Sequence, residues 1–464
     1  MEIPLRPTLA SERSLPFPLR ALGLALALLA LPPGCRVADR ASLKQAPQAA
    51  PAQALDETAA AYVRLVLALG EHDPDFVDAY YGPEAWRDEV RRQKKSLPDI
   101  SDESIRLVAR LNALSLKHED EMTRLRWSYQ VHQIQAVSAR AQMLLGRKLT
   151  FDQESQALYD AVAPHFSDEH FLEILDQLEK LLPGRGPLSA RYESFKKDFI
   201  IPPERLDAVF TAAIQEARRR TKLHLKLPDD ESFTVEYVTG KPWSAYNWYK
   251  GRAHSVIQVN TSLPIYIDRA IDLAAHEGYP GHHVYNALLE QSLVRGRGWV
   301  EFTVYPLFSP QSLVAEGSAN YGIEVAFPGE ERVSFERDIL FPLAGLDRQR
   351  AGAYTDVLDQ IKLLSYAGNE AGRRYLNGEI NARQAADWLT RFELMPPERA
   401  QQRIQFMDKY RSYIINYNLG EDLVKHYVEG KGGTEDQVEK RWEIFGGLLS
   451  SPRLPSDLQG GGNP

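Results

Sequence analysis

Three of the chain's eleven histidines fall within one run of eight residues, 276–283, which reads HEGYPGHH. Zinc prefers imidazole nitrogens and carboxylate oxygens as ligands, and a catalytic zinc ion keeps three protein ligands and one position open to water. Two histidines of this run and one carboxylate from elsewhere would complete such a set. The run therefore predicts a site for one zinc ion, and the fold must bring a distant carboxylate to it.

Pro280 limits how this run can fold. In the common zinc motif H-E-x-x-H the two histidines lie one helical turn apart, but here the fourth residue after His276 is proline. On a regular helix His282 would point about 120° away from His276, and His283 would lie about 10.5 Å further along the axis. Proline interrupts a helix, and glycine accepts almost any backbone geometry. We therefore expect a bulge at Pro280 and Gly281 that brings His282 to His276, with His283 as the alternative second ligand.

The same run resembles the motif of a large bacterial family, domain-of-unknown-function family eight-eight-five, whose members are regarded as zinc peptidases of the gluzincin type. The resemblance extends over residues 55–450, and outside the motif it is clearest at residues 315–317 and 410–420. It implies that a glutamate on a later helix is the third ligand. Within the run it implies one general base and two metal ligands, namely Glu277, His276 and His282.

Glu316 is the predicted third ligand. Ser309 and Pro310 form a typical helix start, with serine as the N-cap and proline as the first helical residue. Glu316 lies early in the helix that they open, and its small neighbours allow other groups to approach closely. Glu324, two turns further along the same segment, is the alternative.

Together these residues predict hydrolysis of an amide bond by water that a metal activates. Zinc lowers the pKa of its bound water, and Glu277 takes the proton and later delivers it to the leaving amine. A further donor should stabilise the developing oxyanion. Tyr417 and Arg411 are predicted for that role or for gripping a substrate carboxylate. His283 and Asp272 are predicted to orient a ligand imidazole.

The pattern of apolar residues predicts the fold class. Three- and four-residue spacing indicates helices through most of residues 55–220. Residues 233–238 and 255–260 alternate and are rich in β-branched residues, which predicts two strands. The expected fold is mainly α with a small β-sheet, and the resemblance implies a gluzincin-like helical metallopeptidase architecture around a cleft. The aromatic residues of 243–249 are expected either to line that cleft or to pack in the core.

The N-terminus resembles an export signal followed by a lipid-attachment site. Three arginines precede an uncharged run, 21–31, which has the length of a signal-peptide core and is too short to span a bilayer. Residues 31–35 resemble the bacterial lipoprotein box apart from Pro32, and Cys35 is the only cysteine of the chain. We expect an exported protein that is lipid-anchored in the bacterial cell envelope on the periplasmic side, or otherwise periplasmic or secreted.

Changes in composition, together with proline and glycine breaks, divide the chain into five expected segments. In order they are a signal peptide (1–35), a flexible linker (36–54), an N-terminal helical region (55–225), a metallopeptidase-like catalytic region (226–450) and a disordered tail (451–464).

The charge balance bears on the partner. A net charge of -8 without a block of like charges gives no basic surface for nucleic acid. We predict zinc-dependent hydrolysis of peptide bonds outside the cytoplasm, with a peptide as substrate. One alternative is a non-catalytic lipoprotein that binds peptide or metal at the same site. The other is a hydrolase of a non-peptide amide.

Overall fold

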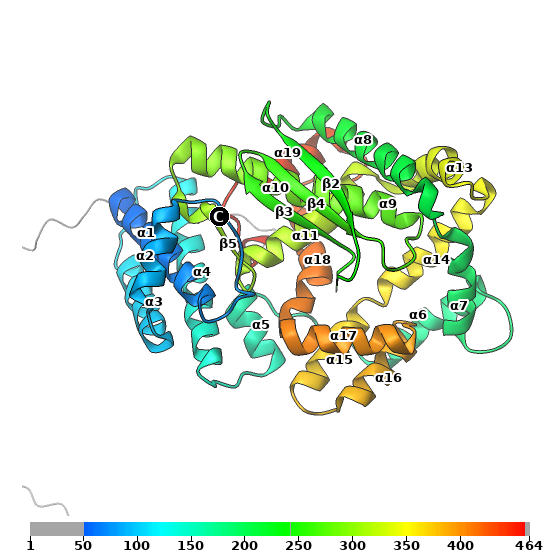
Figure 1. The fold of residues 1–464 in the computed structure, drawn as a ribbon, viewed down its shortest axis with the longest axis horizontal. Helices are drawn as coiled ribbons and strands as arrows, with labels where there is room; N and C mark the ends of the chain where they lie inside the picture. The colour runs from blue at the N-terminus through cyan, green and yellow to red at the C-terminus, as the bar shows by residue number, and fades with distance from the viewer. Residues whose placement is uncertain (1–50, 242, 460–464) are drawn as a thin grey trace, which may run out of the picture. The chain divides into compact units, whose positions relative to one another are not determined.

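Helices make up most of residues 51–241 and 243–459, which the computed structural model describes (Figure 1). The predicted fold class, mainly α with a small β-sheet, is confirmed. In the first helix the apolar residues spaced three and four apart are all buried, as the sequence pattern requires: Tyr62, Leu65, Val66 and Leu69. The helices before the sheet are α1 (Pro51–Gly70), α2 (Glu84–Gln93), α3 (Leu97–Asn112), α4 (Glu121–Leu144), α5 (Phe151–Tyr159), α6 (Asp168–Leu181), α7 (Leu188–Lys196) and α8 (Leu206–His224).

A three-stranded sheet follows α8. Its strands are β2 (Ser232–Val238), β3 (Ala245–Gly251) and β4 (His254–Asn260). The order is β2-β4-β3, with β2 parallel and β3 antiparallel to β4. Two of these strands were predicted, whereas the aromatic segment between them forms β3, an edge strand that the sequence did not reveal. Arg252 and Ala253 both have positive φ and close the turn from β3 to β4, as in a type I′ hairpin.

A second, smaller sheet ties the first part of the chain to a later part. Strand β1 (Val77–Tyr80) pairs antiparallel with β5 (Val304–Pro306). Strand β1 lies inside the region that was expected to be helical almost throughout, so that expectation is wrong at these residues. Strand β1 also lies against β3, so a segment from the N-terminal part reaches the three-stranded sheet.

The segment after the sheet carries the histidine run. Helix α9 (Asp268–Leu273) continues into a π-helical turn, η3 (Ala274–Gly278), and α10 (His282–Leu289) follows after a break. Helix α10 contacts both β3 and β4, and Figure 1 shows α9 and α10 beside the sheet. Helix α11 (Pro310–Ala326) begins where Ser309 and Pro310 predicted. The hydroxyl of Ser309 does not cap the helix but donates to the backbone oxygen of Pro306, 2.7 Å away.

Helices complete the described chain. Of the helices named next, α18, α19 and α20 contact α11, and α18 makes the most extensive contact. The helices are α12 (Gly329–Phe335), α13 (Phe341–Ala344), α14 (Ala351–Leu363), α15 (Tyr366–Leu376), α16 (Ala382–Phe392), α17 (Pro397–Tyr410), α18 (Ile415–Gly430), α19 (Val438–Leu449) and α20 (Pro455–Gln459), with shorter helical turns η4 (Glu290–Arg295), η5 (Val300–Thr303), η6 (Glu336–Leu340), η7 (Arg348–Arg350) and η8 (Arg411–Ile414).

Both ends of the described chain correct the expected segments. Helix α1 starts at Pro51, inside the expected linker 36–54, and Ala54 at its first turn is buried. Helix α20 lies inside the expected disordered tail, where Leu454 and Leu458 are fully buried in the core. The expected signal peptide with Cys35 lies outside the described residues.

The residues on both sides of the expected segment boundary at residue 225 belong to one compact unit. One buried core joins Phe210 of α8 to Ile257 of β4, and another joins Tyr62 of α1 to Leu313 of α11. No helix in the described part of the chain is long and apolar enough to cross a membrane.

Helices α11 and α18 cross with their backbones in contact. A Cβ atom on Gly317 would lie 2.2 Å from the carbonyl carbon of Gly420, and one on Gly420 would lie 2.7 Å from the backbone oxygen of Leu313. Only glycine fits at such a crossing. The contact sets Glu316, the neighbour of Gly317, against the first turns of α18.

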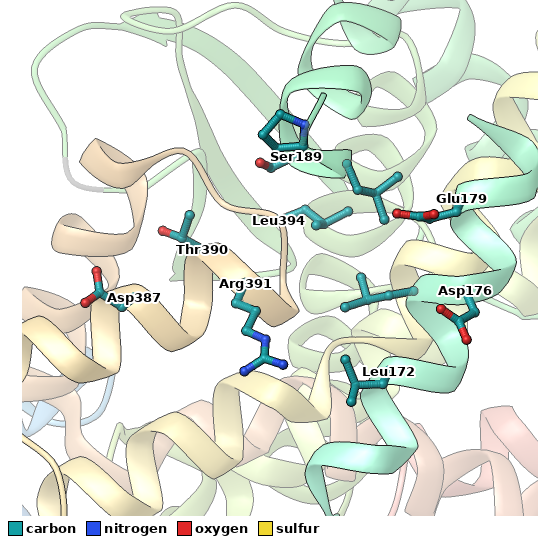
Figure 2. Close-up of a pocket in the computed structure, with 11 residues that line it drawn as sticks. Leu172, Asp176, Glu179, Ser189, Asp387, Thr390, Arg391 and Leu394 are labelled. Carbon is teal, nitrogen blue, oxygen red and sulfur yellow. The ribbon is translucent and has the colours of Figure 1, made fainter. Parts of the chain in front are cut away.

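A surface hollow of about 410 Å³ lies between α6, α7 and α16. Figure 2 shows Asp176 and Glu179 on one wall and Asp387 and Arg391 on the other, with leucines between them. None of its lining residues belongs to the histidine run or to α11. This hollow is therefore distinct from the site described below.

Replacing Gly317 with alanine tests the helix crossing. The added methyl group meets backbone atoms of Gly420 that cannot rotate away, so we expect the free energy of unfolding to fall by about 1–3 kcal/mol. Urea denaturation measures it. The matched control is Gly352→Ala on the exposed side of α14, where a Cβ meets nothing within 4 Å and alanine should stabilise by up to about 1 kcal/mol. Equal stability of Gly317→Ala and the wild type would contradict the crossing.

Candidate metal centre

The break after η3 brings His276 and His282 together. Tyr279 leaves helical geometry with φ −119° and ψ 110°, and Gly281 follows with φ −74° and ψ −136°. A Cβ on Gly281 would lie 1.9 Å from the backbone oxygen of His276, so no other residue fits. Across this break the Nε2 atoms of His276 and His282 lie 3.1 Å apart. The bulge expected at Pro280 and Gly281 is therefore present.

Glu316 completes a group of three. Its Oε2 lies 3.4 Å from Nε2 of His276 and 3.7 Å from Nε2 of His282. Ligand atoms bonded to zinc at about 2.0–2.2 Å in a tetrahedron are separated by roughly 3.3–3.6 Å. The three atoms thus have the spacing of three corners of a zinc site, and they are the only group of three or more potential metal ligands found among the described residues.

The two oxygens of Glu316 have different surroundings. Oε1 accepts a hydrogen bond from the hydroxyl of Tyr413 at 2.7 Å. Oε2 is buried and has no hydrogen-bond partner among the residues described. A buried carboxylate oxygen without a partner is rare and calls for an explanation, such as an ion. The donor set and the orphaned oxygen fit a zinc ion.

Asn320 fixes the tautomer of His276. Its Nδ2 donates to the backbone oxygen of Tyr417 at 2.8 Å, which leaves its Oδ1 to accept from Nδ1 of His276, also at 2.8 Å. Nδ1 therefore carries the hydrogen, and Nε2 of His276 keeps its lone pair for a metal. Sequence reasoning missed Asn320. Its position one turn after Glu316 on the same face of α11 was the available signal.

Charges in the centre favour a cation. Burial alone would raise the pKa of Glu316, but the two histidines hold that pKa well below its usual range. Burial also opposes protonation of His282, whereas the carboxylates of Glu316, Glu277 and Asp78 raise the pKa of His282 to about 9. The three carboxylates thus favour positive charge at this place, which a dication held by the two histidines and Glu316 would supply.

Glu277 lies next to these ligands. The residue is only 6% exposed, and no described residue donates a hydrogen bond to its carboxylate. Its backbone oxygen accepts from Nδ2 of Asn247 on β3 at 2.7 Å, which attaches η3 to the edge strand. A carboxylate left without a protein donor beside a metal centre is available to water or to a substrate.

Asp78 on β1 is a second acidic group that sequence reasoning missed. Burial raises its pKa, and the carboxylates of Glu316 and Glu277 add to the effect while His282 opposes it, with a net pKa of about 7. The hydroxyl of Tyr246 on β3 donates to its Oδ1. No local pattern marks Asp78, because it reaches the centre only through the pairing of β1 with β5.

His283 points away from the centre. It is fully buried, its Nδ1 lies 2.8 Å from the hydroxyl of Ser255, and its Nε2 lies 3.3 Å from a carboxylate oxygen of Glu231. Glu231 also accepts from Tyr279. His283 therefore anchors α10 to the sheet, and the structure supports neither its alternative role as the second ligand nor its expected contact with a ligand imidazole.

Two other acidic candidates are engaged elsewhere. The carboxylate of Glu324 pairs with Lys362 at 2.8 Å and with Lys425 at 2.9 Å, so it is not the third member of the group. Asp272 pairs with Arg332 at 2.9 Å. The expected role of Asp272 in orienting an imidazole is taken by Asn320.

Of the two predicted donors, only Tyr417 lies close to the centre. Its ring packs against Tyr413 with centroids 5.7 Å apart. Burial and the carboxylates of Glu316 and Glu277 raise the pKa of Tyr417 well above its ordinary value, so its hydroxyl keeps its proton. Arg411 is held by Glu154 at 2.6 Å. The structure therefore does not bring Arg411 to the centre.

No protein-family model matches this chain, and no curated protein matches it significantly. Solved structures similar to it include the following three. A "putative lipoprotein" from Colwellia psychrerythraea has a TM-score of 0.48 and 15% identity, over 78% of this chain and 65% of that one. The chain thus spans less than two thirds of that protein's length.

The M32 carboxypeptidase of Deinococcus radiodurans R1 has a TM-score of 0.43 and 13% identity, over 88% of this chain and 93% of that one. A "putative lipoprotein of unknown function" from Shewanella oneidensis has a TM-score of 0.37 and 11% identity, over 78% and 76% of the two chains.

Replacing each of the two adjacent histidines with alanine, one at a time, tests the ligand set. We expect His282→Ala to lower zinc affinity on the order of 100-fold or more, because it removes a ligand. His283→Ala should lower stability but leave stoichiometric zinc on the folded protein. Metal analysis after dialysis against a weak chelator measures both. The control is His426→Ala, at an exposed position on α18. Loss of zinc from His283→Ala but not from His282→Ala would contradict the assignment.

Proposed function

We propose that the chain is a zinc-dependent hydrolase that cleaves peptide bonds outside the cytoplasm. The proposal is supported by one observation: the His276, His282 and Glu316 group lies beside the carboxylate of Glu277, which has no protein hydrogen-bond donor. Three protein ligands leave one zinc position open, as in catalytic rather than structural sites. The buried, orphaned oxygen of Glu316 supports a metal at this place.

In this proposal Glu277 is the general base. Zinc in the site would polarise a water molecule and the substrate carbonyl. The Glu277 carboxylate takes the proton of the attacking water and gives it to the nitrogen of the leaving amine. It has no competing protein donor, so it is free to exchange that proton.

Tyr417 is the proposed donor to the oxyanion. Its hydroxyl forms no hydrogen bond with the described residues, and its raised pKa keeps it protonated at neutral pH. A protonated donor with a fixed ring can stabilise negative charge that develops on a carbonyl oxygen. Tyr413 has a different role, because its hydroxyl is already bound to Glu316.

Replacing Glu277 with glutamine tests the proposed chemistry. We expect hydrolysis of a mixed peptide library, followed by mass spectrometry, to fall about 10²–10⁴-fold while zinc content is unchanged. The control is Glu330→Gln at an exposed position of α12, which should keep full activity. If the wild type binds one zinc and cleaves neither peptides nor other amides, the chain is a metal- or peptide-binding protein instead. Cleavage of cell-wall fragments alone would indicate a non-peptide amide.

The location outside the cytoplasm is part of the proposal and depends on residues 1–35. We propose that Cys35 is acylated and anchors the chain to the cell envelope. Globomycin, which blocks cleavage of lipoprotein precursors, should make the slower-migrating precursor accumulate. Cys35→Ser should abolish labelling by a fatty-acid analogue. Unchanged mobility under globomycin would contradict the anchor.

A further inference from the structure

A second polar group, built from Asp78 and Tyr246, lies close enough to the candidate metal centre for Asp78 to interact electrostatically with His282, Glu316 and Glu277. Asp78 comes from β1 and Tyr246 from β3, two strands that lie against each other. The hydroxyl of Tyr246 donates to one oxygen of Asp78. No described residue donates to the other oxygen. Tyr246 thus holds one oxygen of the Asp78 carboxylate in place, and the other oxygen has no protein donor.

The charges around this group are unbalanced. Three carboxylates, those of Asp78, Glu277 and Glu316, perturb one another or the same histidine, and within the described chain none of them forms an ion pair with a lysine or arginine. When all three carboxylates are ionised, a dication at the His276, His282 and Glu316 group leaves one negative charge.

The Glu277 carboxylate is independent evidence that a ligand belongs here. More than nine tenths of this residue is buried, yet no described side chain or backbone amide satisfies its carboxylate. A metal accounts for the unpartnered oxygen of Glu316. The carboxylate of Glu277 and the second oxygen of Asp78 have no protein donor and are available to a water molecule or a substrate group.

The N-terminal ammonium group and the C-terminal carboxylate of a peptide would find different binding partners at this centre. A C-terminal carboxylate needs a cationic partner, and the arginine predicted for that purpose, Arg411, is already paired with Glu154. An N-terminal ammonium group needs a carboxylate and gains from nearby aromatic faces. Beside Asp78, Tyr246 belongs to an aromatic cluster with Trp243 and Trp248, whose ring centroids lie 5.7 Å and 4.6 Å from its own.

From this arrangement we infer that Asp78, held by Tyr246, binds the free α-ammonium group of the substrate, so that the centre acts near the N-terminus of short peptides. The inference rests on the proposed function, because it places the substrate across the same centre. Tyr246 is a positioning residue that acts through Asp78.

Peptide binding by an inactive protein tests the inference without requiring turnover. The protein is the zinc-loaded full chain with Glu277→Gln, and calorimetry measures its affinity for three probes. They are an alanine tripeptide amide with a free amine, its N-acetylated form, and the N-acetylated tripeptide with a free carboxylate. We expect the free amine to bind at least about tenfold more tightly than either acetylated peptide.

Asp78→Asn in the same protein keeps the shape and removes the charge. We expect it to abolish the preference for the free amine while affinity for the acetylated amide stays the same, and Tyr246→Phe should reduce the preference in part. Equal binding of all probes, tightest binding of the free carboxylate, or a preference that survives Asp78→Asn would overturn the inference. Failure of the proposed function has another signature, namely no hydrolysis by the wild type even where the free amine binds best.

Discussion

Two imidazoles that are six residues apart can meet only where the chain leaves helical geometry between them. Gly281 makes this departure, and the backbone oxygen of His276 occupies the space where any side chain at residue 281 would lie. The same break turns the next residue, His283, toward Ser255 and Glu231. One helix start therefore supplies a candidate ligand and, directly after it, a buried anchor to the sheet.

The rest of the centre depends on how α11 meets α18. The glycine contact at Gly317 lets Glu316 lie against the aromatic residues of α18 and η8, and Tyr413 binds the oxygen of Glu316 that does not face the histidines. Asn320 connects His276 to the backbone of Tyr417. A single helix crossing thus links three parts of the centre. They are the orientation of His276, the carboxylate of Glu316 and the proposed oxyanion donor, Tyr417.

The features that could be predicted from the sequence are those fixed by local order. The spacing of His276, Glu277 and His282 around Pro280 lies within one short run, and the start of α11 is marked by its own residues. Asp78 could not be predicted in this way. It reaches the centre because four residues of β1 pair with a strand more than two hundred residues later, and such short pairings leave no periodic signal. Edge strand β3 was missed for a related reason, since its aromatic residues are equally typical of a core.

The proposed centre requires His276, His282 and Glu316 to hold one metal ion. X-ray diffraction at the zinc absorption edge, on crystals of the protein grown with zinc, locates that ion. We expect a single anomalous peak bonded at about 2.0–2.2 Å to Nε2 of both histidines and to Oε2 of Glu316. A zinc ion bound through His283, or bound elsewhere while these three atoms remain without metal, would contradict it.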